Sequence, residues 1–142
     1  MRASGILMPV FSLPSRYGIG SFSKSAYQFV DMLKKAGQKY WQILPLCPTS
    51  YGDSPYQSST YAGNPYFIDL DQLIEEKLLT RKECQACDFG DDPQDIDYGK
   101  LYENRFKLLR KAYERANVGE DQEFEAYRRK NAWWLDDYAL FM

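Results

Sequence analysis

The residues best suited to bind a ligand lie in one stretch that starts at Tyr51 and reads YGDSPYQSSTYAGNPYFIDL. Tyrosine recurs there at every fifth position, which matches neither helical periodicity nor strand alternation and predicts a loop. Aromatic rings pack against the C–H face of a pyranose, and polar groups such as Asp53, Ser54, Gln57 and Asn64 bind its hydroxyls. This mixture is compatible with a sugar-binding loop, although aromatic residues line the pockets of many other ligands. The alternative, that the rings fold under as a small satellite core, stays open on sequence alone.

Three carboxylates, Asp53, Asp69 and Asp71, lie in or beside this loop. Cleavage or transfer of a glycosidic bond needs two carboxyl groups that flank the bond. The spacing does not show that any two of these residues do so. Asp residues beside Pro and Gly more often form turns, so a turn-forming role is the simpler interpretation.

Cys84 and Cys87 form a C-x-x-C pair, a spacing found in zinc sites and in redox sites. Zinc needs four ligands, and the chain offers only Cys47 besides this pair and no histidine. A redox pair is expected to open a helix after a strand, whereas this pair lies in a charged segment predicted to be helical. A structural role is therefore favoured over a redox or zinc protein, and neither a metal nor a cofactor is predicted.

The composition is that of a folded domain with a real core: 142 residues, 44% hydrophobic and 27% charged. The net charge is −2 and the basic residues are dispersed among acids, so no nucleic-acid partner is expected. The N-terminal run GILMPVFSLP is short and interrupted by Pro9 and Pro14, which argues against a signal peptide or a membrane span. With three cysteines and no disulfide framework, a cytoplasmic location is expected.

The first half of the chain is predicted to be a βαβ unit with a parallel sheet, and the fold class is α/β. Residues 5–11 form an apolar run that predicts a buried strand, and the segment KYWQILPL predicts a second. Between them, apolar residues recur at helical spacing, with Ser23 as the expected N-cap and Gly37 as the stop.

The second half is predicted to be helical. DQLIEEKLL and TRKECQAC predict short helices, and residues 98–116 a longer amphipathic one with Asp97 as N-cap. A last helix is expected to turn Trp134 toward the core, while Trp133 points elsewhere. Its apolar stripe still runs at the final residue, so the chain is expected to be truncated. The amphipathic faces are predicted to comprise Leu101, Phe106, Leu109, Ala112 and Tyr113 in the longer helix, and Phe124, Tyr127, Trp134, Leu135, Tyr138 and Phe141 in the last.

Four segments carry a resemblance to a known family: SLPSRYGIG, WQILPLCPTSYGDSPYQS, AGNPYFIDL and WWLDDYALFM. From about Ser4 to its last residue the chain resembles the N-terminal part of the 4-α-glucanotransferases of glycoside hydrolase family 77, the amylomaltases. The resemblance implies a cytoplasmic, metal-free enzyme that acts on α-1,4-glucans and maltooligosaccharides, with no nucleic-acid or membrane partner. It implies that residues 1–70 supply the first two strands of a (β/α)₈ TIM barrel, the helix between them and the substrate loop 46–66. Residues 71–142 then form a truncated helical insertion.

The resemblance also implies roles for particular residues. Tyr56 is expected to stack near the scissile sugar and Ser54 to hydrogen-bond the glucan beside it. Asp53 belongs to the same substrate-binding set and is expected to shape the turn. Tyr51 and Tyr102 correspond to rings at a secondary glucan site. No catalytic residue is expected within residues 1–142, because the family's carboxylates come from later strands, so this chain alone is expected to be inactive.

Two departures from the family pattern concern the loop. Cys47 stands where the family has glycine, and the SSTY segment between Gln57 and Ala62 is one residue shorter, which affects the ring that covers the cleft. An alternative function is a stand-alone carbohydrate-binding module that uses the tyrosines without catalysis.

Overall fold

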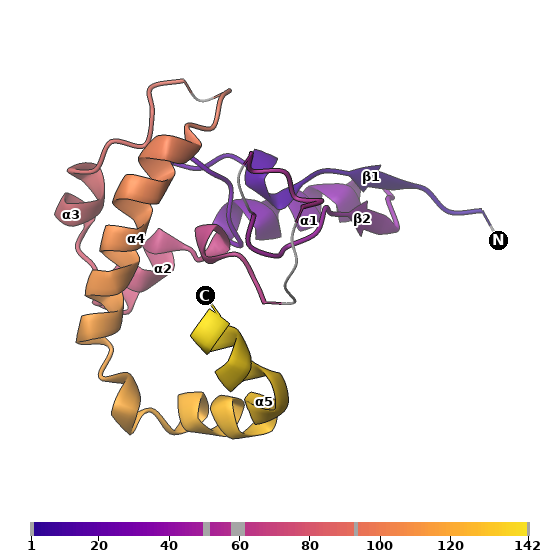
Figure 1. Ribbon diagram of the computed structural model, residues 1–142. Helices are drawn as coiled ribbons and strands as arrows, with labels where there is room; N and C mark the ends of the chain where they lie inside the picture. Colours follow the sequence, from indigo (N-terminus) through magenta and orange to yellow (C-terminus); the bar gives the residue numbers. More distant parts are fainter. Residues whose placement is uncertain (1, 50–51, 58–61, 93, 142) are drawn as a thin grey trace.

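The computed structural model describes residues 2–49, 52–57, 62–92 and 94–141. Two strands and helix α1 lie at one end of the molecule, α2 and α3 lie beside α4, and α5 curves away from the end of α4 (Figure 1). In the part of the chain that is described, no helix is both long and apolar enough to cross a membrane. The elements in chain order are β1 (Gly5–Leu7), η1 (Val10–Ser12), α1 (Lys24–Lys35), β2 (Tyr40–Gln42), η2 (Pro65–Phe67), α2 (Leu70–Glu75), α3 (Arg81–Gln85), α4 (Tyr98–Arg115), η3 (Val118–Glu120) and α5 (Gln122–Phe141).

The parallel pairing of the two strands is confirmed, but their predicted length is wrong. β1 pairs with β2 from Gly5 opposite Tyr40 to Leu7 opposite Gln42, and α1 connects them. A β-carbon at Gly5 would lie 2.6 Å from the Tyr40 carbonyl oxygen, so the strands approach closely there. The strand predicted over residues 5–11 ends at Leu7 because Pro9 precedes a 3₁₀ turn. It is also exposed along its length rather than buried.

Local capping signals in the first helix are confirmed. Ser23 is the N-cap of α1, and its hydroxyl accepts a hydrogen bond from the Ser25 N–H at 3.3 Å. Gly37 has φ +71°, the left-handed conformation that ends a helix and that glycine adopts without strain. The short helices α2 and α3 and the Asp97 cap of α4 are also present where the sequence predicts them.

One apolar core joins the N-terminal loop, η2 and the helices α1 to α4. It draws on residues from both sides of position 70, and the domain boundary at that position stays a prediction. The buried members are Val10, Leu13, Tyr17, Ile19, Ala26, Tyr66, Phe67, Leu70, Leu79, Cys84, Phe89, Leu101, Leu108 and Ala112.

The buried face of α4 differs from the predicted one. Leu101 and Ala112 are buried as expected, but Phe106 and Tyr113 are exposed. In the predicted α5 stripe, Trp134 is only half-buried, and none of the described residues of α5 is buried. The prediction that Trp134 faces a core is therefore wrong for this structure.

Arg105 occupies the centre of the buried face of α4, where hydrophobic periodicity gives no sign of it. Its side chain is only 1% exposed. The guanidinium donates through Nη2 to the Ile68 carbonyl at 2.5 Å and through Nη1 to the Tyr17 carbonyl at 3.4 Å. Burial lowers the pKa of Arg105 to about 10, and the negative charge of Asp69 opposes that shift. The group therefore stays protonated at neutral pH and ties α4 to two separate loops.

Glu83 ties α3 to α4 at the surface. Its carboxylate accepts hydrogen bonds from Arg115 at 2.8 and 2.9 Å and from the Thr80 hydroxyl at 2.8 Å, and Lys111 lies 3.4 Å away. Thr80 and Glu83 also form a capping box at the start of α3. These donors, Arg115 foremost, hold the pKa of Glu83 well below its usual range.

We expect Arg105→Lys to lower the free energy of unfolding by about 2–4 kcal/mol, because one ammonium cannot serve both carbonyls and a buried polar group is then left unsatisfied. Urea denaturation of the two proteins measures this. Arg110→Lys, an exposed change on the same helix, is the control and should shift the free energy by about 0.5 kcal/mol or less. Equal, small effects for both variants would contradict the role given to Arg105.

We expect Glu83→Gln to lower the melting temperature at pH 7 and to lower it less in acid. A carboxylate whose folded pKa is depressed contributes stability above its unfolded pKa of about 4.3, and this stability is lost as the pH falls through the folded pKa. Melting temperatures of both proteins at pH 7 and about pH 3 test the sign. Glu103→Gln, exposed on α4, should show no such pH-dependent difference. A gap between wild type and Glu83→Gln that is constant with pH would contradict the assignment.

Candidate functional site

The two ends of the substrate loop 46–66 are held together by a buried residue. The Asn64 N–H donates to the Leu46 carbonyl at 2.7 Å, and the Asn64 side-chain oxygen accepts from the Tyr66 N–H at 2.9 Å. Asn64, Tyr66 and Phe67 are all buried, and Pro65 starts the short helix η2. The base of the loop is therefore fixed to the core.

The described part of the loop tip is a tight turn. Gly52 has φ +93° and Asp53 has φ +54°, both in the left-handed region. The Thr49 hydroxyl donates to Asp53 Oδ1 at 3.3 Å, and the Gln57 N–H donates to the Ser54 carbonyl at 3.1 Å. Asx and Gly residues tolerate this backbone better than other types, which explains why Gly-Asp-Ser-Pro stands here. Asp53 thus has a structural partner, and Ser54 starts the turn that carries Tyr56.

The loop tyrosines that can be compared have opposite environments. Tyr66 is 7% exposed and packs in the core, as the satellite-core alternative expects. Tyr56 is 73% exposed, so its ring is available to a ligand. Tyr51 and Tyr61 lie outside the described residues. Burial within this chain therefore accounts for Tyr66 but not for Tyr56.

A row of four rings, which we call the aromatic row, joins η2 to α4: Tyr98, Tyr66, Phe106 and Tyr102. Tyr66 lies 6.3 Å from Tyr98 and 5.5 Å from Phe106, measured between ring centroids. Phe106 meets Tyr102 edge to face at 5.5 Å. Tyr102 is 68% exposed at the outer end of the row. Phe106 was not predicted as a site residue, although its spacing of four from Tyr102 on a helix is a readable signal.

Asp53 lies close enough to this row to affect its ionisation. Burial raises the pKa values of Tyr66 and Tyr98, and the negative charge of Asp53 is the second cause for both. Both tyrosines stay neutral at physiological pH, as rings in a partly apolar environment should.

The other candidate carboxylates and cysteines have structural partners. Asp69 caps α2, and Asp71 accepts a hydrogen bond from the Tyr17 hydroxyl at 2.6 Å. Cys84 is buried, and burial raises its pKa to about 11 and also raises the pKa of Cys87. Thiols with raised pKa values are poor nucleophiles. No group of three or more metal-ligating side chains is found within the described ranges.

Comparison with known proteins identifies the family. Residues 8–142 match the model of the 4-alpha-glucanotransferase family of glycoside hydrolases, family 77. The chain is 55% identical over 136 residues to the 4-alpha-glucanotransferase of Clostridium butyricum. This alignment covers 95% of this chain and 28% of that protein. It is 47% identical over 146 residues to the enzyme of Thermus thermophilus, covering 99% of this chain and 28% of that protein.

A solved structure agrees with these matches. The amylomaltase of Streptococcus agalactiae, in complex with acarbose, superimposes with a TM-score of 0.85 at 43% identity, covering 94% of this chain and 28% of that one. The chain thus spans about 28% of the length of the relatives it matches. A match that extends over nearly all of the chain does not favour a stand-alone carbohydrate-binding module. The chain belongs to the 4-alpha-glucanotransferase family, glycoside hydrolase family 77.

Proposed function

We propose that the protein that contains this chain is a 4-α-glucanotransferase. It transfers α-1,4-glucan segments to the 4-hydroxyl of an acceptor glucan or of glucose, and α-glucans and maltooligosaccharides are its substrates. The observation that carries this proposal is the family match over residues 8–142, supported by relatives that are all named for this activity. The cytoplasmic location remains a prediction.

The reaction proceeds with retention by double displacement. One carboxylate forms a covalent glycosyl-enzyme, and a second carboxylic acid protonates the leaving oxygen and then deprotonates the acceptor. These two groups lie in the part of the protein beyond residue 142, and the mechanism requires no metal or cofactor. This chain supplies the first two strands and the first helix of a (β/α)₈ barrel. The exposure of both short strands supports this, because parallel strands are normally covered on both faces.

The substrate loop is the binding element of this chain. Tyr56 stacks its exposed ring on the sugar near the scissile bond, Ser54 hydrogen-bonds the glucan beside it, and Asp53 holds the turn that presents them. Three features support this: the 73% exposure of Tyr56, the fixed loop base at Asn64, and the position of the loop after a parallel strand, where barrel enzymes bind their substrates.

Tyr102 and Tyr51 form a secondary glucan site outside the cleft. The structure supports the part that involves Tyr102, because the ring is exposed and Phe106 contacts it edge to face. A pre-oriented ring loses little conformational freedom when a sugar stacks on it. Such a site holds a second stretch of a long glucan and has no effect on short ones.

We expect the full-length protein to convert maltotriose into glucose and longer maltodextrins, and Tyr56→Ala to lower kcat/KM for this reaction by roughly ten- to a hundredfold. Stacking of a nucleic-acid base on an aromatic ring, worth about 1–3 kcal/mol, is the nearest measured analogue, and 1.4 kcal/mol is a factor of ten. The matched control is Tyr27→Ala on α1, because Tyr27 is also 73% exposed and lies outside the loop.

Melting temperatures measured on the same preparations separate binding from folding. Loss of kcat/KM with an unchanged melting temperature supports the stacking role. A destabilised Tyr56→Ala that retains normal turnover per folded molecule would remove Tyr56 from the site. Absence of any transfer by the wild-type protein would overturn the proposed function itself.

We expect Tyr102→Ala to leave transfer between maltotriose molecules within about twofold of wild type and to slow the reaction on amylose severalfold, since the secondary site engages only long chains. Tyr113→Ala is the control because Tyr113 lies on the same helix and is also 68% exposed. Rates on both substrates for the three proteins provide the test. An equal loss on maltotriose and amylose would place Tyr102 in the catalytic cleft instead.

A further inference from the structure

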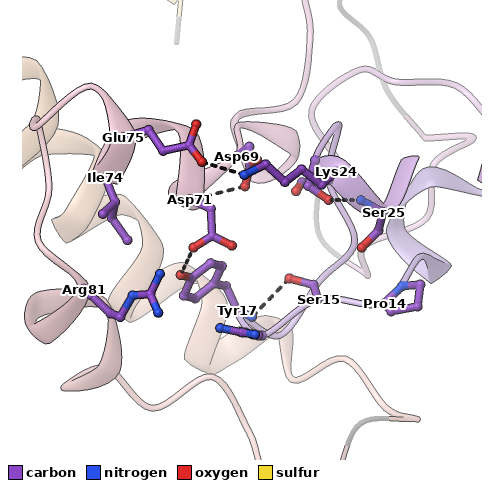
Figure 2. Close-up of a pocket in the computed structure, with 13 residues that line it drawn as sticks. Pro14, Ser15, Tyr17, Lys24, Ser25, Asp69, Asp71, Ile74, Glu75 and Arg81 are labelled. Atoms are coloured by element: carbon purple, nitrogen blue, oxygen red, sulfur yellow. Dashed lines mark hydrogen bonds and ion pairs between the residues drawn. The ribbon is translucent and has the colours of Figure 1, made fainter. Parts of the chain in front are cut away.

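A polar cavity lies away from the substrate loop, between the β1–α1 connection and the start of α2 and α3. Its volume is about 510 Å³, within the range of small-molecule sites. We call it the Tyr17 groove. Figure 2 shows the carboxyl group of Asp71, the hydroxyl of Ser15 and the paired Lys24 and Glu75 around one common space. The lining residues are Pro14, Ser15, Arg16, Tyr17, Ser21, Ser23, Lys24, Ser25, Asp69, Asp71, Ile74, Glu75 and Arg81.

Several polar groups of the groove are fixed by one hydrogen bond and retain capacity for another. The Tyr17 hydroxyl donates to Asp71 Oδ1 at 2.6 Å, which holds that carboxylate in place and leaves Oδ2 as an acceptor. The Asp71 N–H donates to Asp69 Oδ1 at 3.1 Å, which likewise holds the Asp69 carboxylate in place and leaves its Oδ2 as an acceptor. The Ser15 hydroxyl oxygen accepts from the Tyr17 N–H at 3.1 Å and keeps its own proton to donate.

Two guanidinium groups complete the lining. Arg16 and Arg81 are both exposed, and neither has a hydrogen bond or ion pair with any described residue. At the rim, Lys24 and Glu75 form an ion pair at 2.6 Å and so neutralise each other. The groove thus combines fixed acceptors with donors that have no hydrogen-bond or ion-pair partner among the described residues.

The charges of the groove decide the class of ligand. Its three cationic and three anionic side chains balance, so the groove favours neither an anion nor a cation. A phosphate would face the carboxylates of Asp69 and Asp71, and within the described ranges no set of metal-ligating side chains is found. A neutral molecule with several hydroxyl groups fits best, because each hydroxyl both donates and accepts hydrogen bonds. Neighbouring hydroxyls match the paired atoms of a carboxylate or a guanidinium.

The position of the groove agrees with this chemistry. Residues 14–23 belong to the connection that follows β1, and Lys24 and Ser25 start α1; in parallel α/β folds ligands bind on the side of such connections. We propose that the Tyr17 groove is a carbohydrate site that binds one or two glucosyl units, separate from the substrate loop and from Tyr102. The choice of a glucan as the ligand rests on the proposed function, whereas the preference for a neutral polyol rests on the groove alone.

Maltose is the probe that tests this site, with the full-length protein. We expect crystals soaked in maltose to show the sugar in the Tyr17 groove. In solution, titration followed by calorimetry should detect a site that weakens at least tenfold in the Arg16→Met/Arg81→Met double variant, because two donors are lost. Asp71→Asn keeps the shape and the Tyr17 contact, and it should weaken the same site. Arg110→Met, an exposed change outside the groove, should have no effect.

The outcomes separate this proposal from the proposed function. Maltose in the groove of a protein that lacks transferase activity supports the site and rejects the function. An active enzyme whose groove stays empty, or whose maltose affinity is the same in the double variant, overturns the site alone. Inorganic phosphate in the groove in place of maltose, or binding at crystal concentration only, also overturns it.

Discussion

The buried guanidinium of Arg105 joins α4 to two loops that are far apart in the chain. Removing a cation from water is costly unless its donors are satisfied. Here two backbone carbonyls from distant loops accept hydrogen bonds from the two terminal nitrogens, whereas the buried Nε has no partner among the described residues. The Tyr17 carbonyl belongs to the β1–α1 connection, and the Ile68 carbonyl lies between η2 and α2. Because one side chain of α4 needs both, the two loops are held at a fixed distance from each other and from the helix.

Both proposed binding regions follow from that arrangement. Ile68 lies two residues after Tyr66, the buried end of the substrate loop, and one residue before Asp69 of the Tyr17 groove. On the flank of α4 next to Arg105, Phe106 packs on Tyr66 and contacts Tyr102 edge to face. The helix that buries Arg105 therefore also presents aromatic rings beside it. A displacement of α4 would disturb the loop base, the groove and the exposed ring together.

The parts of the structure that the sequence predicts are those decided by neighbouring residues. The caps at Ser23 and Asp97 and the left-handed Gly37 depend on side chains within a few positions, and all three are present. The strand over residues 5–11 was predicted too long because its end depends on the partner strand and on Pro9. Arg105 was missed because an arginine in a helix normally faces solvent, and only the two remote carbonyls explain its burial.

The candidate site divides in the same way. The sequence marks the loop and its tyrosines, but both Tyr56 and Tyr66 directly follow a proline in the same Tyr-rich stretch, so their positions in it do not distinguish them. Their tertiary environments distinguish them. Asn64 closes the loop base beside the buried Tyr66, whereas Tyr56 lies in the turn that starts at Ser54 and is exposed to solvent. The Tyr17 groove could not be predicted from the sequence, since its lining residues come from two separate segments, 14–25 and 69–81, that meet only after folding. Its paired atoms, Asp71 and the Tyr17 hydroxyl, lie 54 positions apart in the chain. Residues so far apart in the chain meet only because Arg105 and the apolar core hold the two segments together. The arrangement of the polar groups in the groove therefore depends on the buried contacts.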